Sequence, residues 1–430
     1  MRLLVLSQFW YPENGVPQRR WTWLSSIFAN MGGEISVVAP PPNYRRKLGV
    51  KDSLRSFVPS SQVETGPAGE EIYRSPFLSA GESLLGRAFS QAFIASGALM
   101  VVARNWAEIR TVDAVVGTVP ALPTAVVSFL VARVFRVPYV IDLRDAWPDL
   151  MKEHRNWNRA LEARSRHEEI INSGPIRILS WIVEKGLNAL LERADAIIVT
   201  SEDLAEKLRS QRSKYLTSQN QQLITTIRNV FPANTPTLPK RHSFDFKTLR
   251  VLYAGTLGRA QNLRNSIDAA AIAQYQGTPV ELVFVGGGAA AKELEKYAAL
   301  KGVNASFYRV RSAAELVRFY EWADTALVHL TDWEPLDRAV PSKTYELMSL
   351  GIHISGVVNG ETARIIESLE AGDTVEPENP HHLAELWTAL FNDPARLSVT
   401  AKGRMWVESE RETVVPGEVK KIVRWVENLK

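Results

Sequence analysis

Short apolar runs alternate with longer amphipathic segments along the first half of this chain. The runs are rich in Val, Ile and Leu, which is typical of strands buried on both faces of a parallel sheet. They occupy residues 2–7, 34–40, 113–118, 138–144 and 195–201. Helical spacing marks residues 17–31 and 83–106, whereas the polar stretch 43–70 is expected to be a long loop. The pattern predicts βαβ units in residues 1–215.

The alternation stops and then starts again. Residues 216–248 are rich in Ser, Gln, Asn, Thr and Pro, and we expect a linker region there. New apolar runs follow at residues 250–255, 280–288, 305–310, 325–330 and 352–357. We therefore expect two doubly wound α/β domains, the second over residues 249–412. Such sheets bind ligands at the carboxyl ends of their strands, so two facing domains would place a cleft between those ends.

Composition narrows the class of protein. A chain of 430 residues with 45% hydrophobic and 23% charged residues is expected to be globular, with two cores. No apolar run reaches the roughly 18 residues of a membrane span, and the start reads as a buried strand, so a cytoplasmic protein is expected. The absence of cysteine excludes disulfides and thiolate metal sites. A net charge of +4 permits attraction to phosphates or an anionic membrane, and no nucleic-acid motif is present.

The stretch AVPSKTYELMSLG, residues 339–351, carries candidate chemistry. It reads as a helix that begins near Pro341 and Ser342 and ends at Gly351. Lys343 and Glu346 stand one turn apart at the end of the helix that attracts anions. A diphosphate and a ribose would explain both residues, and so would an ordinary ion pair three residues apart.

Glycine-bearing turns follow two of the expected strands. YAGTLGRAQNL places Gly255, Gly258 and Arg259 after one strand, and FVGGG places Gly286 and Gly287 after the next. Backbone N–H groups, together with Arg259 and Lys343, would balance two phosphates. The alternative is that glycine at such a turn serves backbone geometry alone.

Together these residues carry a resemblance. The chain resembles retaining glycosyltransferases of family 4, which have the GT-B fold of two facing Rossmann-like domains, and is most similar to the aminosugar-transferase-like branch that makes bacterial surface polysaccharides. The matching segments run in order over nearly the whole chain. They include LSQFWYPENGVPQRR (6–20), IDLRDAWPD (141–149), IRNVF (227–231), LYAGTLGRAQNL (252–263) and VPSKTYELMSLG (340–351).

The resemblance implies that the C-terminal domain binds the donor, a nucleoside diphosphate sugar that is expected to be UDP-linked. Lys343 would neutralise the diphosphate and Glu346 would bind the ribose hydroxyls. It also implies that Gly15 approaches the donor phosphates. A final helix, residues 413–430, is expected to return to the N-terminal domain.

One position departs from the family pattern. Many members carry a first Glu eight residues before the second, and here that position is Arg338. Glu334 and Asp337 stand nearby. The family usually has an Arg and a Lys after the first strand of the C-terminal domain, and here Arg259 is expected to take over their cationic role.

The acceptor side rests on the segment after the fourth apolar run. Asp145 is expected to orient an acceptor hydroxyl or act as a base, with Asp142 as a second candidate. Arg144 is either an acceptor-side residue or one half of a structural pair. Arg19, or its neighbour Arg20, would face the cleft.

These features predict transfer of a sugar from a nucleotide donor to an acceptor hydroxyl, with Asp145, Arg259 and Lys343 as the catalytic residues. No Asp-x-Asp or histidine cluster indicates a metal, and the resemblance implies metal-independent transfer without a further cofactor. The basic cluster Arg45–Lys47 and the apolar run 83–106 suggest a polyprenyl-diphosphate-linked acceptor at an anionic membrane surface. A nucleotide-sugar epimerase of GT-B fold and a non-catalytic nucleotide-sugar-binding protein are the alternatives.

Overall fold

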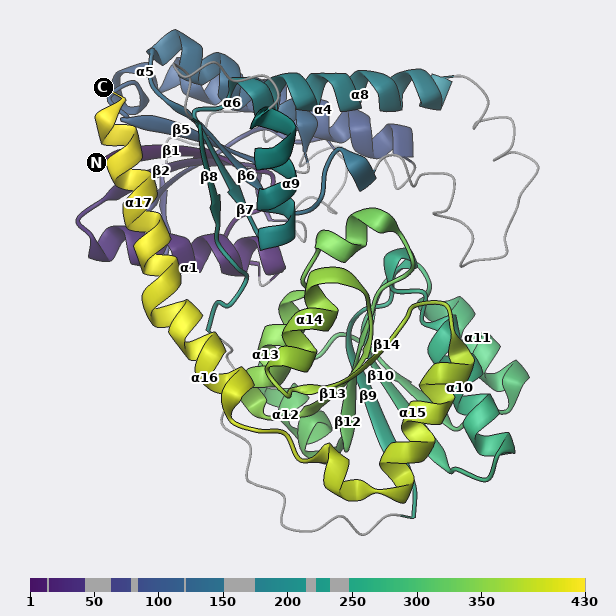
Figure 1. Cartoon of the computed structure of the whole chain (residues 1–430). Coiled ribbons are helices and arrows are strands. Elements are labelled where there is room, and N and C mark those ends of the chain that lie inside the picture. The colour runs from purple at the N-terminus through teal and green to yellow at the C-terminus, as the bar shows by residue number, and fades with distance from the viewer. Residues whose placement is uncertain are drawn as a thin grey trace. The chain divides into compact units, whose positions relative to one another are not determined.

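The computed structural model describes residues 1–13, 15–42, 63–78, 84–119, 121–150, 175–213, 222–232 and 247–429. The chain divides into two compact units (Figure 1). Unit 1 contains Met1–Pro148, Ile178–Phe231 and Thr413–Lys430, and unit 2 contains Asp149–Arg177 and Pro232–Glu412. Among the described residues, no helix is both long and apolar enough to cross a membrane.

Unit 1 is built on a sheet with the strand order β3-β4-β2-β1-β5-β6-β7-β8, in which every pair except β3 and β4 is parallel. Its strands are β1 (Arg2–Leu6), β2 (Glu34–Ala39), β3 (Glu64–Thr65), β4 (Glu71–Arg74), β5 (Ala114–Val119), β6 (Tyr139–Leu143), β7 (Ala196–Val199) and β8 (Leu223–Thr226). Its helices are α1 (Val16–Asn30), α4 (Leu84–Arg104), α5 (Trp106–Ile109), α6 (Leu122–Phe135), α8 (Pro175–Arg193), α9 (Glu202–Ser213) and α17 (Val415–Asn428).

Unit 2 has a parallel sheet in the order β11-β10-β9-β12-β13-β14. Its strands are β9 (Leu249–Thr256), β10 (Val280–Gly287), β11 (Ala305–Tyr308), β12 (Thr325–His329), β13 (His353–Val357) and β14 (Gly372–Val375). Figure 1 shows the helices on both sides of this sheet. They are α10 (Arg264–Tyr275), α11 (Ala291–Lys301), α12 (Ala313–Trp322), α13 (Ser342–Leu350), α14 (Gly360–Ser368), α15 (Pro380–Asn392) and α16 (Lys402–Ser409), with 3-10 turns η3 (Arg259–Gln261), η4 (Glu334–Arg338) and η5 (Pro394–Leu397) and a π-helical turn at Glu410–Val414.

The predicted α/β class with two doubly wound parallel sheets is confirmed. Three short strands were not expected from the sequence. β4 follows the stretch read as a long loop and β3 lies within it, whereas β8 lies within the expected linker 216–248. Each has only two to four residues, too few to show a hydrophobic pattern. Residues 45–47, the basic cluster, lie outside the described part of the chain.

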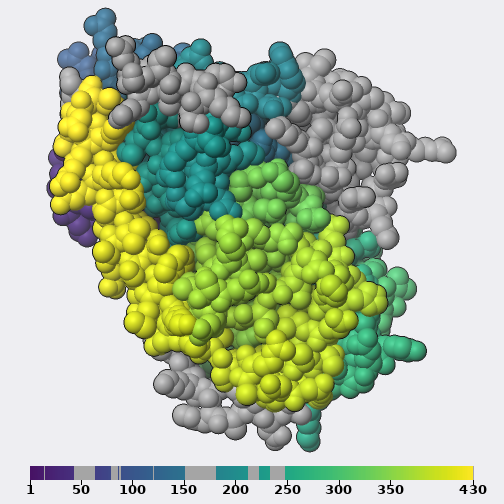
Figure 2. Space-filling view, in the orientation of Figure 1, coloured from purple at the N-terminus to yellow at the C-terminus, as the bar shows by residue number. Residues whose placement is uncertain are grey.

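The last helix, α17, belongs to unit 1. Its buried side chains, Val415, Val419, Ile422 and Val426, recur at helical spacing and form one apolar face. The helix packs against α1 and β8, and the Trp425 indole N–H donates to the Asp195 carbonyl at 3.1 Å. Figure 2 shows its other side exposed on the surface.

A wholly buried ion pair joins three elements of unit 1. Arg20 of α1 and Asp142 of β6 both have 0% exposed side chains, and their closest N–O distance is 3.0 Å. The Trp21 indole N–H donates to the other Asp142 oxygen at 2.9 Å. Arg20 also donates to the Ile227 carbonyl at 2.7 Å and to Asn229 Oδ1 at 3.0 Å, just after β8. These bonds compensate the cost of burying both charges.

A second buried polar contact joins α10 to β12 in unit 2. The Asn265 side-chain amide lies 3.1 Å from His329 Nε2, and both residues are buried. Burial lowers the pKa of His329 to about 3, because the charged imidazolium is poorly solvated there. The ring is therefore neutral at physiological pH.

Replacing Arg20 should test the buried pair. We expect Arg20→Met to lower the free energy of unfolding by about 3–5 kcal/mol, because Asp142 then stays buried without its cation. Chemical denaturation measures the loss. Arg19→Met is the matched control, since Arg19 is less buried than Arg20 and its guanidinium lies over the Phe231 ring at 4.4 Å, so its loss should lower the free energy of unfolding by about 1 kcal/mol or less. Equal small losses in the two variants would contradict a structural role for the pair.

The pKa of His329 predicts a pH dependence of stability. The folded pKa lies below the unfolded value of about 6.5, so as the pH falls from 6.5 towards 3 the unfolded chain binds a proton first and stability declines. The decline between pH 7 and pH 5 should be about 2 kcal/mol. His329→Gln keeps a polar group beside Asn265 but does not titrate there. Denaturation curves at both pH values should therefore show a smaller decline in the variant, and parallel declines would refute the assignment.

Candidate functional site

The carboxyl edge of the unit 2 sheet contains a topological switch point. β9 lies between β10 and β12, and the chain leaves it towards one side and returns to the other, which is where doubly wound sheets place ligands. The turn after β9 leads into η3. The Thr331 N–H, just after β12, donates to the Ala260 carbonyl in η3 at 2.9 Å. The two loops at the switch point are thus tied together.

Close backbone packing accounts for part of the glycine pattern. Gly286 of β10 pairs with Gly255 of β9, and a Cβ on Gly286 would lie 1.8 Å from the Gly255 carbonyl oxygen. A Cβ on Gly288 would lie 2.2 Å from the Leu257 carbonyl oxygen. Gly258 has no such backbone neighbour, because its nearest contact is the flexible end of Gln261. Backbone geometry therefore explains Gly286 and Gly288, and Gly287 has only an ordinary contact with Val310.

Arg259 lies at the start of η3, and its guanidinium has a nitrogen without a hydrogen-bond partner among the described residues. Its side chain is partly buried, and its Nε is shielded from solvent without a hydrogen-bond partner. A shielded guanidinium donor without an acceptor is costly, and an anion at this position would remove the cost. Arg259 is the sequence-predicted cation whose environment in this unit most favours binding a phosphate.

Lys343 and Glu346 form the ion pair that the sequence left open as an alternative. The Lys343 ammonium lies 3.0 Å from Glu346 Oε2, on the first turn of α13. It also donates to the Tyr320 hydroxyl at 2.9 Å, and that hydroxyl donates to Glu346 Oε1 at 2.8 Å. The three side chains close a triangle between α12 and α13. Lys343 keeps 25% of its side chain exposed, so it remains accessible to a ligand.

The start of α13 has no side-chain cap. Pro341 is the N-cap residue, with φ −59° and ψ 133°, and it has no side-chain hydrogen-bonding group. Ser342 is the first helical residue. Uncapped N–H groups of a first turn are suitable donors to an anion.

Arg338, the residue at the family's first Glu position, is neutralised by acids within unit 2. Its guanidinium donates to Glu334 Oε1 at 2.5 Å and to Oε2 at 3.2 Å. Asp149 Oδ2 lies 3.5 Å away. These carboxylates raise the pKa of Arg338 against the opposing effect of burial. Glu334 is therefore engaged by Arg338.

The acceptor-side candidates of unit 1 fall into two groups. Both carboxylate oxygens of Asp142, the second acceptor-side candidate, accept hydrogen bonds from Arg20 and Trp21 inside the unit. Arg20 is equally buried, so only Arg19 of the two neighbouring arginines reaches the surface. Gly15 is the exposed N-cap residue of α1.

Arg144 and Asp145 follow β6. The Arg144 Nε donates to the Val119 carbonyl at 2.9 Å, while its Nη1 is buried without a partner. Burial lowers the pKa of Arg144, and Asp142 and Asp145 oppose this. Asp145 itself is exposed at the surface. Loss of solvation next to the protein raises the pKa of Asp145, and the positive charge of Arg144 opposes this rise. Because the side chain still contacts solvent, the rise is limited.

Sequence patterns missed one side chain of these sites and left the position of a second one open. Tyr320 lies 23 residues before Lys343 in the amphipathic helix α12, and no motif marks its hydroxyl. Arg20 stands beside Arg19, and only the burial pattern of α1 separates the two. Within the described ranges, no three His, Cys, Asp or Glu side chains come together as a metal site.

Comparison with known proteins gives the fold its name. Residues 234–406 match the family model of glycosyl transferases group 1. No curated protein matches the chain. Among solved structures, a sucrose-phosphate synthase from Thermosynechococcus elongatus has a TM-score of 0.66 at 15% identity, and 100% of each chain is covered.

Two further solved structures are similar over their full length. HepE from Anabaena, in complex with UDP-glucose, has a TM-score of 0.63 at 14% identity, with 99% of each chain covered. The pneumococcal O-GlcNAc transferase GtfA, in complex with UDP and GlcNAc, has a TM-score of 0.58 at 12% identity, with 100% of this chain and 99% of that chain covered. The two sheets thus form a GT-B fold. Together, the family model that matches residues 234–406 and the glycosyltransferases among these neighbours identify the chain as a glycosyltransferase.

Proposed function

We propose that this glycosyltransferase moves a sugar from a UDP-linked donor to an acceptor hydroxyl, with retention, in the synthesis of a surface polysaccharide or glycolipid. The observation that carries the donor site is the shielded Arg259 Nε at the switch point of unit 2, which has no hydrogen-bond partner among the described residues. HepE and GtfA were solved with UDP-glucose and with UDP and GlcNAc, which favours uridine in the donor. The likeness to family 4 and its aminosugar-transferase-like branch supports retention, and the anomeric configuration of the product tests it.

In this proposal, Arg259 and the uncapped start of α13 bind the diphosphate. Lys343 turns from Glu346 to a phosphate oxygen, and Glu346 then accepts hydrogen bonds from the ribose hydroxyls. Tyr320 holds both residues in place. Fixed cations and helix N–H groups stabilise the charge that develops on the leaving diphosphate, and we propose that no metal is needed.

The acceptor is expected to approach unit 1. Asp145 would orient the acceptor hydroxyl, with Arg144 and Arg19 as further contacts. The leaving phosphate would itself help to remove the proton in a front-face reaction, so a second catalytic carboxylate is not required.

A titration of UDP, GDP and ADP tests the donor site. UDP should bind selectively to the wild type. Arg259→Ala and Lys343→Ala should each weaken it about 30-fold or more, since each removes a charge-assisted contact to phosphate. Tyr320→Phe should weaken it about tenfold, because it removes only the hydroxyl that positions Lys343 and Glu346. Calorimetry measures all four affinities.

Arg318→Ala is the matched control, because Arg318 is an exposed arginine of α12. The affinity of the Arg318→Ala variant for UDP should equal that of the wild type. GDP or ADP selectivity would change the donor class and keep the transferase. Release of UDP from a UDP-sugar without any acceptor would favour the epimerase alternative, and UDP-sugar binding without turnover over a broad acceptor panel would favour the non-catalytic one.

We further propose that the acceptor is linked to polyprenyl diphosphate at the inner face of an anionic membrane. An exposed apolar stripe on α6, formed by Val126, Leu130 and Val134, supports this. These residues are four apart and lie on one face of the helix. The exposed arginines Arg104 and Arg133 lie on α4 and α6 and suit an anionic lipid.

Vesicle flotation tests the membrane proposal. The wild type should float with vesicles that contain anionic phosphatidylglycerol, and binding should fall with rising salt. Leu130→Asp should reduce the bound fraction several-fold, because a carboxylate then meets the anionic surface. Leu300→Asp is the control, because Leu300 is an exposed apolar residue of unit 2 outside the stripe. Absence of wild-type binding, or equal losses in the two variants, would rule the stripe out as a membrane contact.

A further inference from the structure

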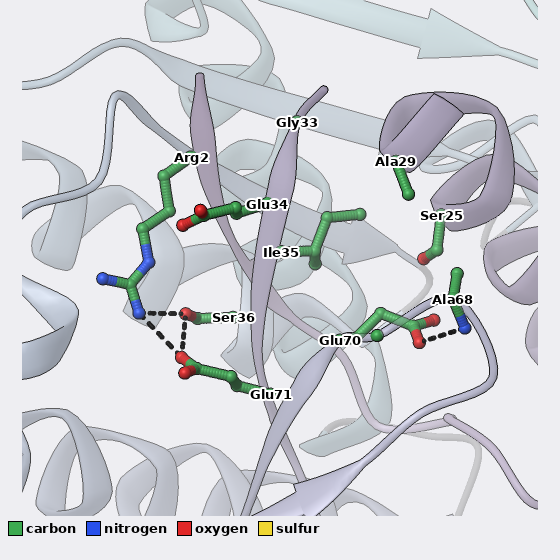
Figure 3. Close-up of a pocket in the computed structure, with 11 residues that line it drawn as sticks. Arg2, Ser25, Ala29, Gly33, Glu34, Ile35, Ser36, Ala68, Glu70 and Glu71 are labelled. Atoms are coloured by element: carbon green, nitrogen blue, oxygen red, sulfur yellow. Dashed lines mark hydrogen bonds and ion pairs between the residues drawn. The ribbon is translucent and has the colours of Figure 1, made fainter. Parts of the chain in front are cut away.

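A groove opens at the amino ends of the unit 1 strands, where β1, β2 and β4 begin. Its volume is about 380 Å³, near the lower end of the range for small-molecule sites. Helix α1 and the turn before β4 form one wall (Figure 3). This edge is remote in topology from the strand carboxyl ends that carry Asp145, so the groove does not belong to the site proposed above.

Two buried polar groups on the groove have no partner. Glu70 is 2% exposed, and its Oε2 accepts the Ala68 N–H at 2.9 Å, whereas its Oε1 is unpaired. Ser25 of α1 is 0% exposed, and its hydroxyl is unpaired. Figure 3 shows these two side chains on the same side of β1 and β2. Unpaired buried polar groups are costly, so two of them lining one groove indicate a missing hydrogen-bond donor.

The charge of the lining selects the class of ligand. Three acids, Glu34, Glu70 and Glu71, line the groove beside a single cation, Arg2. Arg2 is already engaged, since it donates to Glu71 Oε2 at 2.7 Å and to Ser36 Oγ at 3.0 Å on the other side of the strands. The remaining acids exclude an anion and favour a cation with N–H donors.

A metal ion fits this groove less well than an organic cation. Among the described residues, no group of three metal-ligating side chains is present here or elsewhere. One free carboxylate oxygen and one hydroxyl instead match two N–H donors of a primary ammonium group. The rest of the lining, Ala29, Ile35, Ala68 and the two glycines Gly33 and Gly69, offers apolar and backbone surface for a short carbon chain.

We propose that this groove binds a small primary ammonium compound, whose ammonium group donates to Glu70 Oε1 and Ser25 Oγ. The proposal stands on unit 1 alone and does not depend on the identity of the sugar donor. The exposed carboxylate of Glu34 at the rim adds long-range attraction for the cation.

Calorimetry with ethanolammonium chloride tests the groove. The full chain should bind ethanolammonium saturably and should not bind tetramethylammonium, which carries the same charge without N–H donors. Glu70→Gln keeps an oxygen for the Ala68 N–H but removes the charge, and it should weaken binding at least tenfold. Glu34→Gln is the matched control at the rim, and its affinity should fall less than threefold.

Ser25→Ala provides an independent readout. It should weaken ethanolammonium binding several-fold, yet the free protein should unfold at the same or a higher temperature, because an unpaired buried hydroxyl is removed. Absence of saturable binding to the wild type would overturn the proposal. Equal binding of tetramethylammonium, or unchanged affinity in both Glu70→Gln and Ser25→Ala, would overturn it as well. UDP binding in the same samples reports separately on the donor site.

Discussion

Unit 1 depends on one charged pair from which solvent is excluded. Arg20 and Asp142 fix α1 against β6, and the remaining guanidinium bonds fix the segment after β8. Such a pair contributes little net attraction relative to water, but each charge would be very costly without the other. Alternative packings of α1 would leave one of them unpaired, so the pair selects a single arrangement. It also sets where Arg144 and Asp145 emerge, directly after β6.

The two candidate cations of unit 2, Lys343 and Arg259, have different surroundings. Lys343 is paired with Glu346 and donates a hydrogen bond to Tyr320, whereas the Arg259 Nε has no hydrogen-bond partner in the described part of the chain. A diphosphate could therefore bind Arg259 directly, whereas Lys343 would first have to leave Glu346. That exchange costs little, because the first-turn pair is partly exposed and Tyr320 can keep its bond to Glu346. In the proposed donor site, Arg259 would therefore make the first contact with a phosphate, and Lys343 would follow.

The sequence could predict the fold far better than the site. Buried parallel strands such as β9 and β10 are continuous apolar runs, and their pattern is visible without any neighbours. Strands of two to four residues, such as β3 and β8, carry too little pattern. The motif PSKTYE located Lys343 and Glu346, but Tyr320 comes from another helix and only tertiary packing unites the three. The sequence does not show that Arg20 turns inward to pair with Asp142, and the placement of the donor and acceptor ligands remains a prediction.

The membership of α17 in unit 1 has a consequence for biosynthesis. The ribosome begins unit 1 first, yet the face made by Val415, Val419, Ile422 and Val426 is synthesised after all of unit 2. During translation, α1 and β8 lack the helix that covers them, whereas unit 2 can complete its sheet and its helices. Domains generally fold as units while they are made, with the N-terminal one first. In this chain the order of completion is reversed, and the nascent first unit needs protection until the last helix arrives.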